Sequence, residues 1–68
     1  MQLHYVSSSN LSCIGYENGV LEIHFKNNTV YHYFNVPEWV FNGLLDAHSK
    51  GEYHAQHIKN SYTYQRVR

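Results

Sequence analysis

Two tyrosines separated by one residue are the feature of this sequence best suited to holding a planar ligand. Tyr31 and Tyr33 lie in the run Thr29–Pro37, where β-branched and aromatic residues are densest and predict a strand. Residues two apart on a strand point to the same face, and aromatic rings on a sheet stack on the bases of nucleotides and single-stranded nucleic acids. Trp39 follows, and an exposed tryptophan stacks on planar ligands or anchors interfaces. For all three residues, packing in a core or an interface is the alternative role.

Five further side chains carry nitrogen atoms suited to a phosphate or to the edge of a base. Lysine and arginine bind phosphate oxygens, and an unperturbed histidine gains its charge near pH ~6.5. The chain has no net charge when histidine is neutral, whereas a long nucleic-acid backbone requires many cations. A small nucleotide therefore suits the composition as well as RNA does, and the residues do not choose between them. The candidate contacts are His24, His32, His54, Lys59 and Arg66.

Two other residue pairs have reactive chemistry but lack the rest of a site. Cys13 is expected opposite His24, which is a nucleophile arrangement in principle, but no evident orienting group or glycine-rich oxyanion loop accompanies it. His54 and His57 are one helical turn apart and suit a shared metal, but no third or fourth ligand stands at a recognisable spacing. We therefore predict no enzymatic activity, no metal and no cofactor.

The elements that position these residues begin with a β-hairpin. Asn18-Gly19 is its signal, because a type I′ turn needs positive φ at both central residues. It joins strands expected over Leu11–Glu17 and Val20–Lys26. Facing residues share a side of the sheet, so Cys13, Gly15, Glu22, His24 and Lys26 form a polar face. The apolar face then holds Ile14, Tyr16, Leu21, Ile23 and Phe25, and the register is Glu17 opposite Val20, Tyr16 opposite Leu21, Ile14 opposite Ile23 and Ser12 opposite Phe25.

The next turn, at Asn27-Asn28, decides which face carries the tyrosines, and two interpretations remain open. A two-residue loop points Tyr31 and Tyr33 away from the helix that covers the sheet. A three-residue loop with a bulge places Phe25 opposite Tyr31 and moves both tyrosines into the core. Burying His32, as the first loop requires, is costly without a hydrogen-bonding partner, which slightly favours the bulged loop.

Helix signals occupy the second half of the chain. Pro37 favours the first position of a helix, and the apolar pattern after it predicts a helix to about His48. Ser49 and Glu52 have the spacing of a capping box, which predicts a second helix from Lys50 to about Ile58.

These elements together predict an α+β fold. We expect a small antiparallel β-meander with one face covered by a helix, plus a second short helix and a C-terminal strand or tail. Leu3–Val6 would add an edge strand and Tyr62–Val67 the last strand. A chain of 68 residues makes one domain, 1–68, whose core is thin because so short a chain buries only ~60% of its unfolded surface. Self-association into a homo-oligomer is the simplest remedy for such a core.

Cysteine usage and hydropathy suggest a compartment. Cys13 is the only cysteine, so no disulfide forms within one chain. A lone cysteine with no basic, apolar leader fits a reducing cytoplasm. No run approaches the ~20 apolar residues of a membrane span, so no membrane is expected as a partner.

An ordered set of short motifs resembles the KTSC domain, a module of about this length. That domain occurs alone in bacteria and phages and at the end of some lysyl-tRNA synthetases. The resemblance spans about residues 7–67, nearly the whole chain. Its matching pieces are Ser9-Asn10, Ile14-Gly15-Tyr16, Leu21–Phe25, Tyr31-His32-Tyr33, Val36-Pro37, Leu44-Leu45, Ser49-Lys50-Gly51, Tyr53 and Ile58.

The resemblance implies little about activity, because the function of the family is not established; its association with synthetases implies an RNA ligand. The Tyr-x-Tyr centre of the family falls on Tyr31 and Tyr33. The chain departs from the family after Tyr53, where His54 and Ala55 replace an aromatic residue and an asparagine, and Lys59 stands where arginine is common. If this segment contacts the ligand, the departure implies a different ligand.

We therefore predict a non-catalytic binding module that recognises or sequesters a nucleotide-type ligand, either a small nucleotide or RNA, by aromatic stacking and by His, Lys and Arg contacts. The alternative is a homo-oligomeric protein–protein interaction module in which the same aromatic residues are interface anchors.

Overall fold

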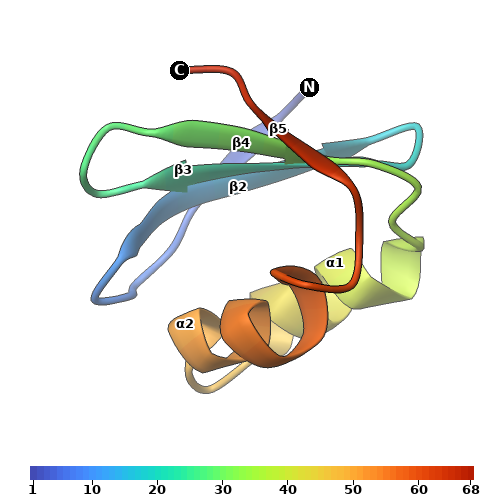
Figure 1. Ribbon diagram of the computed structural model, residues 1–68. Coiled ribbons are helices and arrows are strands. Elements are labelled where there is room, and N and C mark those ends of the chain that lie inside the picture. Colours follow the sequence, from blue (N-terminus) through green and yellow to red (C-terminus); the bar gives the residue numbers. More distant parts are fainter.

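Five antiparallel strands form a sheet in which each strand pairs with the next one in the sequence, and all helices cover one face of it (Figure 1). The structure is a computed structural model that describes residues 1–68. This arrangement confirms the predicted α+β fold, with a helical layer on one face of the meander. The elements are β1 (Leu3–Tyr5), β2 (Leu11–Glu17), β3 (Val20–Phe25), β4 (Val30–Tyr33), α1 (Glu38–Asp46), α2 (Lys50–Tyr53), the π-helical turn η1 (His54–Ile58) and β5 (Tyr64–Arg66).

The hairpin of β2 and β3 has the predicted turn and, near that turn, the predicted register. Asn18 and Gly19 both have positive φ, at 52° and 82°, and the three pairs that follow the turn are as expected. The expectation that Ser12 lies opposite Phe25 is wrong. The register shifts between Leu11 and Cys13, and Leu11 pairs with Phe25. This bulge turns Leu11 into the core, where it is fully buried, because an extra residue reverses which side chain faces inward.

The loop between β3 and β4 places the tyrosines on the helix-covered face. Lys26–Thr29 separate the two strands, the hydrogen bond between Phe25 and Thr29 encloses three of these residues, and Asn28 has a φ of 71°. Tyr31 lies opposite Ile23 and Tyr33 opposite Leu21, so the face predicted for the bulged loop is correct. The predicted pair of Phe25 and Tyr31 is wrong, since the Phe25 N–H donates to the Thr29 carbonyl at 2.9 Å. The observed register differs from the predicted one by two residues. Because side chains alternate between the two faces of a sheet, a shift of two residues leaves each side chain on its predicted face.

The helices follow the sequence signals, with a shorter first helix than expected. Pro37 is the N-cap of α1 and not, as predicted, its first helical residue, because its backbone is extended; the helix begins at Glu38 and ends at Asp46, two residues before His48. In the next helix the Ser49 hydroxyl accepts a hydrogen bond from the Glu52 N–H, at 3.4 Å, which is one of the two bonds of a capping box. Helical backbone then continues through η1 to Ile58, as predicted. No helix has the length and apolar character needed to cross a membrane.

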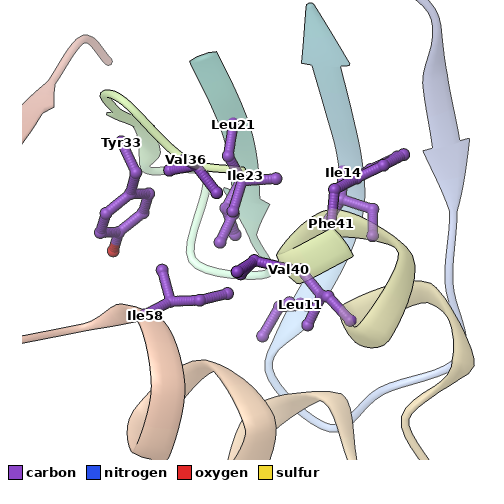
Figure 2. Close-up of a cluster of buried hydrophobic side chains, with 10 residues drawn as sticks. Leu11, Ile14, Leu21, Ile23, Tyr33, Val36, Val40, Phe41 and Ile58 are labelled. Carbon is purple, nitrogen blue, oxygen red and sulfur yellow. The ribbon is translucent and has the colours of Figure 1, made fainter. Parts of the chain in front are cut away.

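The core lies between the sheet and the helices. Figure 2 shows side chains of the strands meeting Val40 and Phe41 from α1, while the Tyr33 ring extends toward the turn that carries Ile58. This core confirms the apolar face predicted for the hairpin. Its buried members are Leu11, Ile14, Leu21, Ile23, Tyr33, Val36, Val40, Phe41, Leu44 and Ile58.

Candidate functional site

A pocket of about 310 Å³ opens between the helix-covered face of the sheet and the segment around η1. Aromatic residues of β3, β4 and β5 form its floor, and His54 of η1 lines it together with residues that follow that turn. We call it the tyrosine pocket. It is lined by Phe25, Asn27, Thr29, Tyr31, Tyr33, His54, Lys59, Asn60 and Tyr64.

Three tyrosine rings form the aromatic part of this pocket. The Tyr31 and Tyr33 rings are near-parallel, with centroids 6.2 Å apart. Tyr64, which pairs with Tyr33 across β4 and β5, leans over both, at 5.7 Å from Tyr31 and 5.8 Å from Tyr33. Tyr33 is only 3% exposed, whereas Tyr64 is 58% exposed. Tyr33 therefore supports the site from within the core, and Tyr64 and the half-buried Tyr31 present ring surface to a ligand.

A buried hydrogen bond joins the sheet to η1 at the inner end of the pocket. The Tyr33 hydroxyl and the His54 Nε2 atom lie 2.9 Å apart. Burial lowers the pKa of His54, with a smaller contribution from the charge of Lys59. Burial raises the pKa of Tyr33 to about 12. Both groups are therefore neutral at neutral pH, and their bond is one between uncharged partners.

The polar lining of the pocket favours a neutral or anionic ligand. Lys59 is its single cation, and no carboxylate lines it. The amides of Asn27 and Asn60 can both donate and accept hydrogen bonds, as the edge of a base requires. Aromatic rings beside one lysine and two amides can hold a planar, singly phosphorylated group.

The other face of the sheet holds His24 and His32, away from the pocket. Their Nε2 atoms each lie 2.6 Å from a different oxygen of Glu22, because Glu22 pairs with His32 across β3 and β4 and His24 is two residues along β3. We call these residues the Glu22 cluster. Hydrogen bonds from the two imidazoles, that from His24 first, hold the pKa of the Glu22 carboxyl below its ordinary value against the opposing effect of burial.

The remaining predicted site residues also lie outside the pocket lining. Trp39 is on α1 and is 70% exposed. Arg66 lies opposite Tyr31 in the sheet, but its Nε–H donates to the Arg68 carbonyl at 3.2 Å. Of the eight predicted ligand-binding residues, the structure therefore brings four together, Tyr31, Tyr33, His54 and Lys59.

The reactive pairs considered from the sequence have other neighbours. Cys13 does pair with His24, as predicted, but it is buried and makes no hydrogen bond to that ring. His54 bonds to Tyr33, whereas the His57 ring packs at 4.7 Å from Tyr53. No group of three or more His, Cys, Asp or Glu residues is arranged to hold a metal ion.

Sequence reasoning missed part of the pocket lining. The sequence places Phe25 on the apolar face of the hairpin and Tyr64 in the last strand, without indicating a ligand contact for either. The sequence marks Asn27 only as part of a turn and Asn60 only as a residue that follows the second helix. Neither position indicates a contact with a ligand. These asparagines line the pocket because η1 lies near the end of β3 that leads into the loop to β4. A local sequence pattern does not predict this packing.

A family model and a solved structure point to the same family, and a curated relative matches most of the chain. The family model of the KTSC domain matches residues 7–62. An uncharacterised protein of Stutzerimonas stutzeri (strain A1501) is 37% identical over 65 residues, which cover 91% of this chain and 92% of that protein. The crystal structure of a KTSC domain protein from Yersinia pestis superposes with a TM-score of 0.94 at 35% identity, covering 98% of this chain and 97% of the other.

Proposed function

This chain belongs to the KTSC domain family, and we propose that its tyrosine pocket binds a nucleotide-type ligand without converting it chemically. The observation that carries the proposal is the composition of the pocket, in which three tyrosine rings, two amides and one lysine converge and no acid is present. Stacking on aromatic rings is tolerant of the base, and a lysine suits a phosphate as a point charge. The pocket would recognise or sequester such a ligand.

A small nucleotide fits this site better than a long RNA. The pocket lies at the small end of the size range of small-molecule sites, and it presents one cation. An RNA reader would track a backbone with several cations, and the nearby Arg66 side chain bonds to the Arg68 carbonyl instead.

The test is calorimetric titration of the protein with AMP, GMP, CMP and UMP. We expect saturable binding that weakens about tenfold in Lys59→Gln, because a hydrogen bond to a charged group contributes ~1.5–3 kcal/mol. Lys26→Gln is the matched control, since Lys26 is exposed on the hairpin loop beside the pocket but does not line it. Equal affinity of both variants, or no heat from any nucleotide, contradicts the proposal.

Aromatic stacking is tested separately with Tyr31→Leu. Loss of one stacking surface, worth ~1–3 kcal/mol per base, should weaken binding roughly tenfold or more. Tyr5→Leu is the control, because Tyr5 is 85% exposed and lies on β1, far along the sheet from the pocket. Chromatography of the nucleotide after incubation should show no product.

The second candidate function is homo-oligomeric protein–protein interaction, and the exposure of two large aromatic residues favours it. Tyr5 and Trp39 are 85% and 70% exposed, and such residues are frequent interface anchors. Analytical ultracentrifugation tests this candidate directly. A stable oligomer that dissociates in Trp39→Ala, together with no response to any nucleotide, would favour it over the pocket.

A further inference from the structure

A second, shallower hollow adjoins the tyrosine pocket. It is formed by the consecutive residues Asn60–Tyr64, which lead from the end of the second helix into β5. Asn60 and Tyr64 line both hollows. The two depressions are therefore neighbours that share a wall.

Tyr64 gives this shared wall two usable sides. Toward the pocket its ring leans over Tyr31 and Tyr33, and the same residue also lines the second hollow. With 58% of its surface exposed, it has ring area left for a ligand. A planar group in either hollow can therefore contact this tyrosine.

The segment that forms the second hollow is held at both ends by backbone hydrogen bonds. The Ser61 N–H donates to the Ile58 carbonyl at 3.1 Å, and the Phe34 N–H donates to the Thr63 carbonyl at 2.9 Å. Tyr62 packs against the hydrophobic core between these two points. The hollow is thus shaped before any ligand arrives, which lowers the cost of ordering on binding.

Charge is compatible with a phosphate that crosses the wall. The second hollow is lined by uncharged residues only, and Lys59, the cation of the pocket, directly precedes the shared residue Asn60. No carboxylate lines either hollow. One phosphodiester near Lys59 would join a group in the pocket to a group in the second hollow.

Resting on the proposed function, we infer that the ligand is a dinucleotide, with one base in the tyrosine pocket and the second base against Tyr64 in the adjoining hollow. Two bases joined by one phosphate match two neighbouring hollows beside one cation. A mononucleotide would fill only the first hollow, and a strand longer than two nucleotides would gain no further contact in these two hollows.

The test is a length series measured by calorimetry, with AMP, ADP, pApA and the hexamer of the same base, repeated with UMP, UDP, pUpU and its hexamer. We expect the dinucleotide to bind at least about tenfold tighter than the mononucleotide, as one more stacked base provides. The nucleoside diphosphate adds charge without a base and should gain little. The hexamer should bind no tighter than the dinucleotide once corrected for the number of possible registers.

A variant isolates the second hollow. Ser61→Leu fills it without changing charge, and should abolish the gain of the dinucleotide while leaving mononucleotide affinity unchanged. Ser9→Leu is the matched control, because Ser9 is also an exposed loop serine but belongs to neither hollow. It should retain the full gain.

The possible outcomes separate this inference from the proposed function. Mononucleotide binding with no gain for the dinucleotide, or a gain that survives Ser61→Leu, overturns the inference and leaves the proposed function standing. Affinity that keeps rising steeply to the hexamer overturns it in favour of an RNA reader. Failure of every nucleotide to bind overturns both.

Discussion

The histidine of the tyrosine pocket and the two histidines of the Glu22 cluster lie on opposite sides of one sheet and have opposite kinds of neighbour. His54 is 8% exposed and bonds to a phenol, and burial lowers its pKa. His24 and His32 are less buried and share one carboxylate. The environment of His54 disfavours a charged imidazole, whereas His24 and His32 surround the charged carboxylate of Glu22. A histidine on this scaffold therefore acquires its properties from the face on which it lies, which spacing along the chain does not reveal.

We expect the largest change in stability from substitutions of Tyr33, which lies on the pocket side of the sheet. Tyr33→Ala removes a buried ring and its bond to His54, and we expect it to lower the free energy of unfolding by about 3–5 kcal/mol, as for other large aromatic truncations. Tyr33→Phe keeps the ring and leaves His54 Nε2 without a partner, at a cost of about 1–3 kcal/mol. Urea denaturation measures both. Equal loss in the two variants would mean that the hydroxyl, and not the ring, is what this face depends on.

An intermediate effect is expected on the opposite face. Glu22→Gln preserves shape but replaces a charged acceptor of two hydrogen bonds by one carbonyl oxygen and one NH2 donor, so one imidazole keeps a bond only in its other tautomer and both bonds lose their charge assistance, at a cost of about 1–3 kcal/mol. Glu38→Gln, an exposed change in the first turn of α1, should cost less than about 1 kcal/mol. Chemical denaturation at pH 7 compares the two. If Glu22→Gln is as stable as the wild type, the Glu22 cluster does not contribute to stability.

The smallest effect is a pH dependence that distinguishes the two faces. The pKa of His54 is lower in the folded chain than its ordinary value of 6.5, so the unfolded chain binds more protons and stability falls as the pH drops below about 6.5. The pKa of Glu22 is lowered from 4.5, and its contribution is lost only below about pH 4.5.

Thermal unfolding between pH 3 and pH 8 resolves these two windows. His54→Gln should flatten the upper window and Glu22→Gln the lower one, while the exposed His57→Gln changes neither. An upper window that persists in His54→Gln would show that another group titrates there, and the contrast between the faces would fail.

Local chemistry explains which parts of the fold were predictable from the sequence. Asn18-Gly19, Pro37 and the Ser49 cap act within a few residues of themselves, so their turns and helix starts were found. The face of Tyr31 and Tyr33 stayed open between two loops, and only the cost of burying His32 without a partner slightly favoured the face that the structure has. The bulge beside Ser12 was missed, since it exists to bury Leu11 under helices that are distant in sequence.

The candidate site was half predictable for the same reason. Aromatic and basic residue types pointed to Tyr31, Tyr33, His54 and Lys59, which the pocket brings together. The assignment of His24 and His32 to a ligand could not anticipate that Glu22 lies between them, because that contact depends on the register of β3 and β4. The role of Phe25 in the pocket depends in the same way on the position of η1. The Phe25 ring packs edge-on against the ring of His54, with ring centroids 5.3 Å apart.

The strand that supplies Tyr64 has a consequence for how the pocket fills. β5 is three residues long, all of them exposed, and it is hydrogen-bonded to β4 alone. Segments with so little burial open locally at a free energy far below that of global unfolding. We therefore expect the amides of Tyr64–Arg66 to exchange with solvent faster than those of the core strands, although hydrogen bonds from Phe34 to Thr63 and from Val67 to Val30 hold the two ends of β5 in place. If the proposed ligand stacks on Tyr64, the exchange of these amides should slow on addition of nucleotide, whereas that of the edge strand β1 should not change.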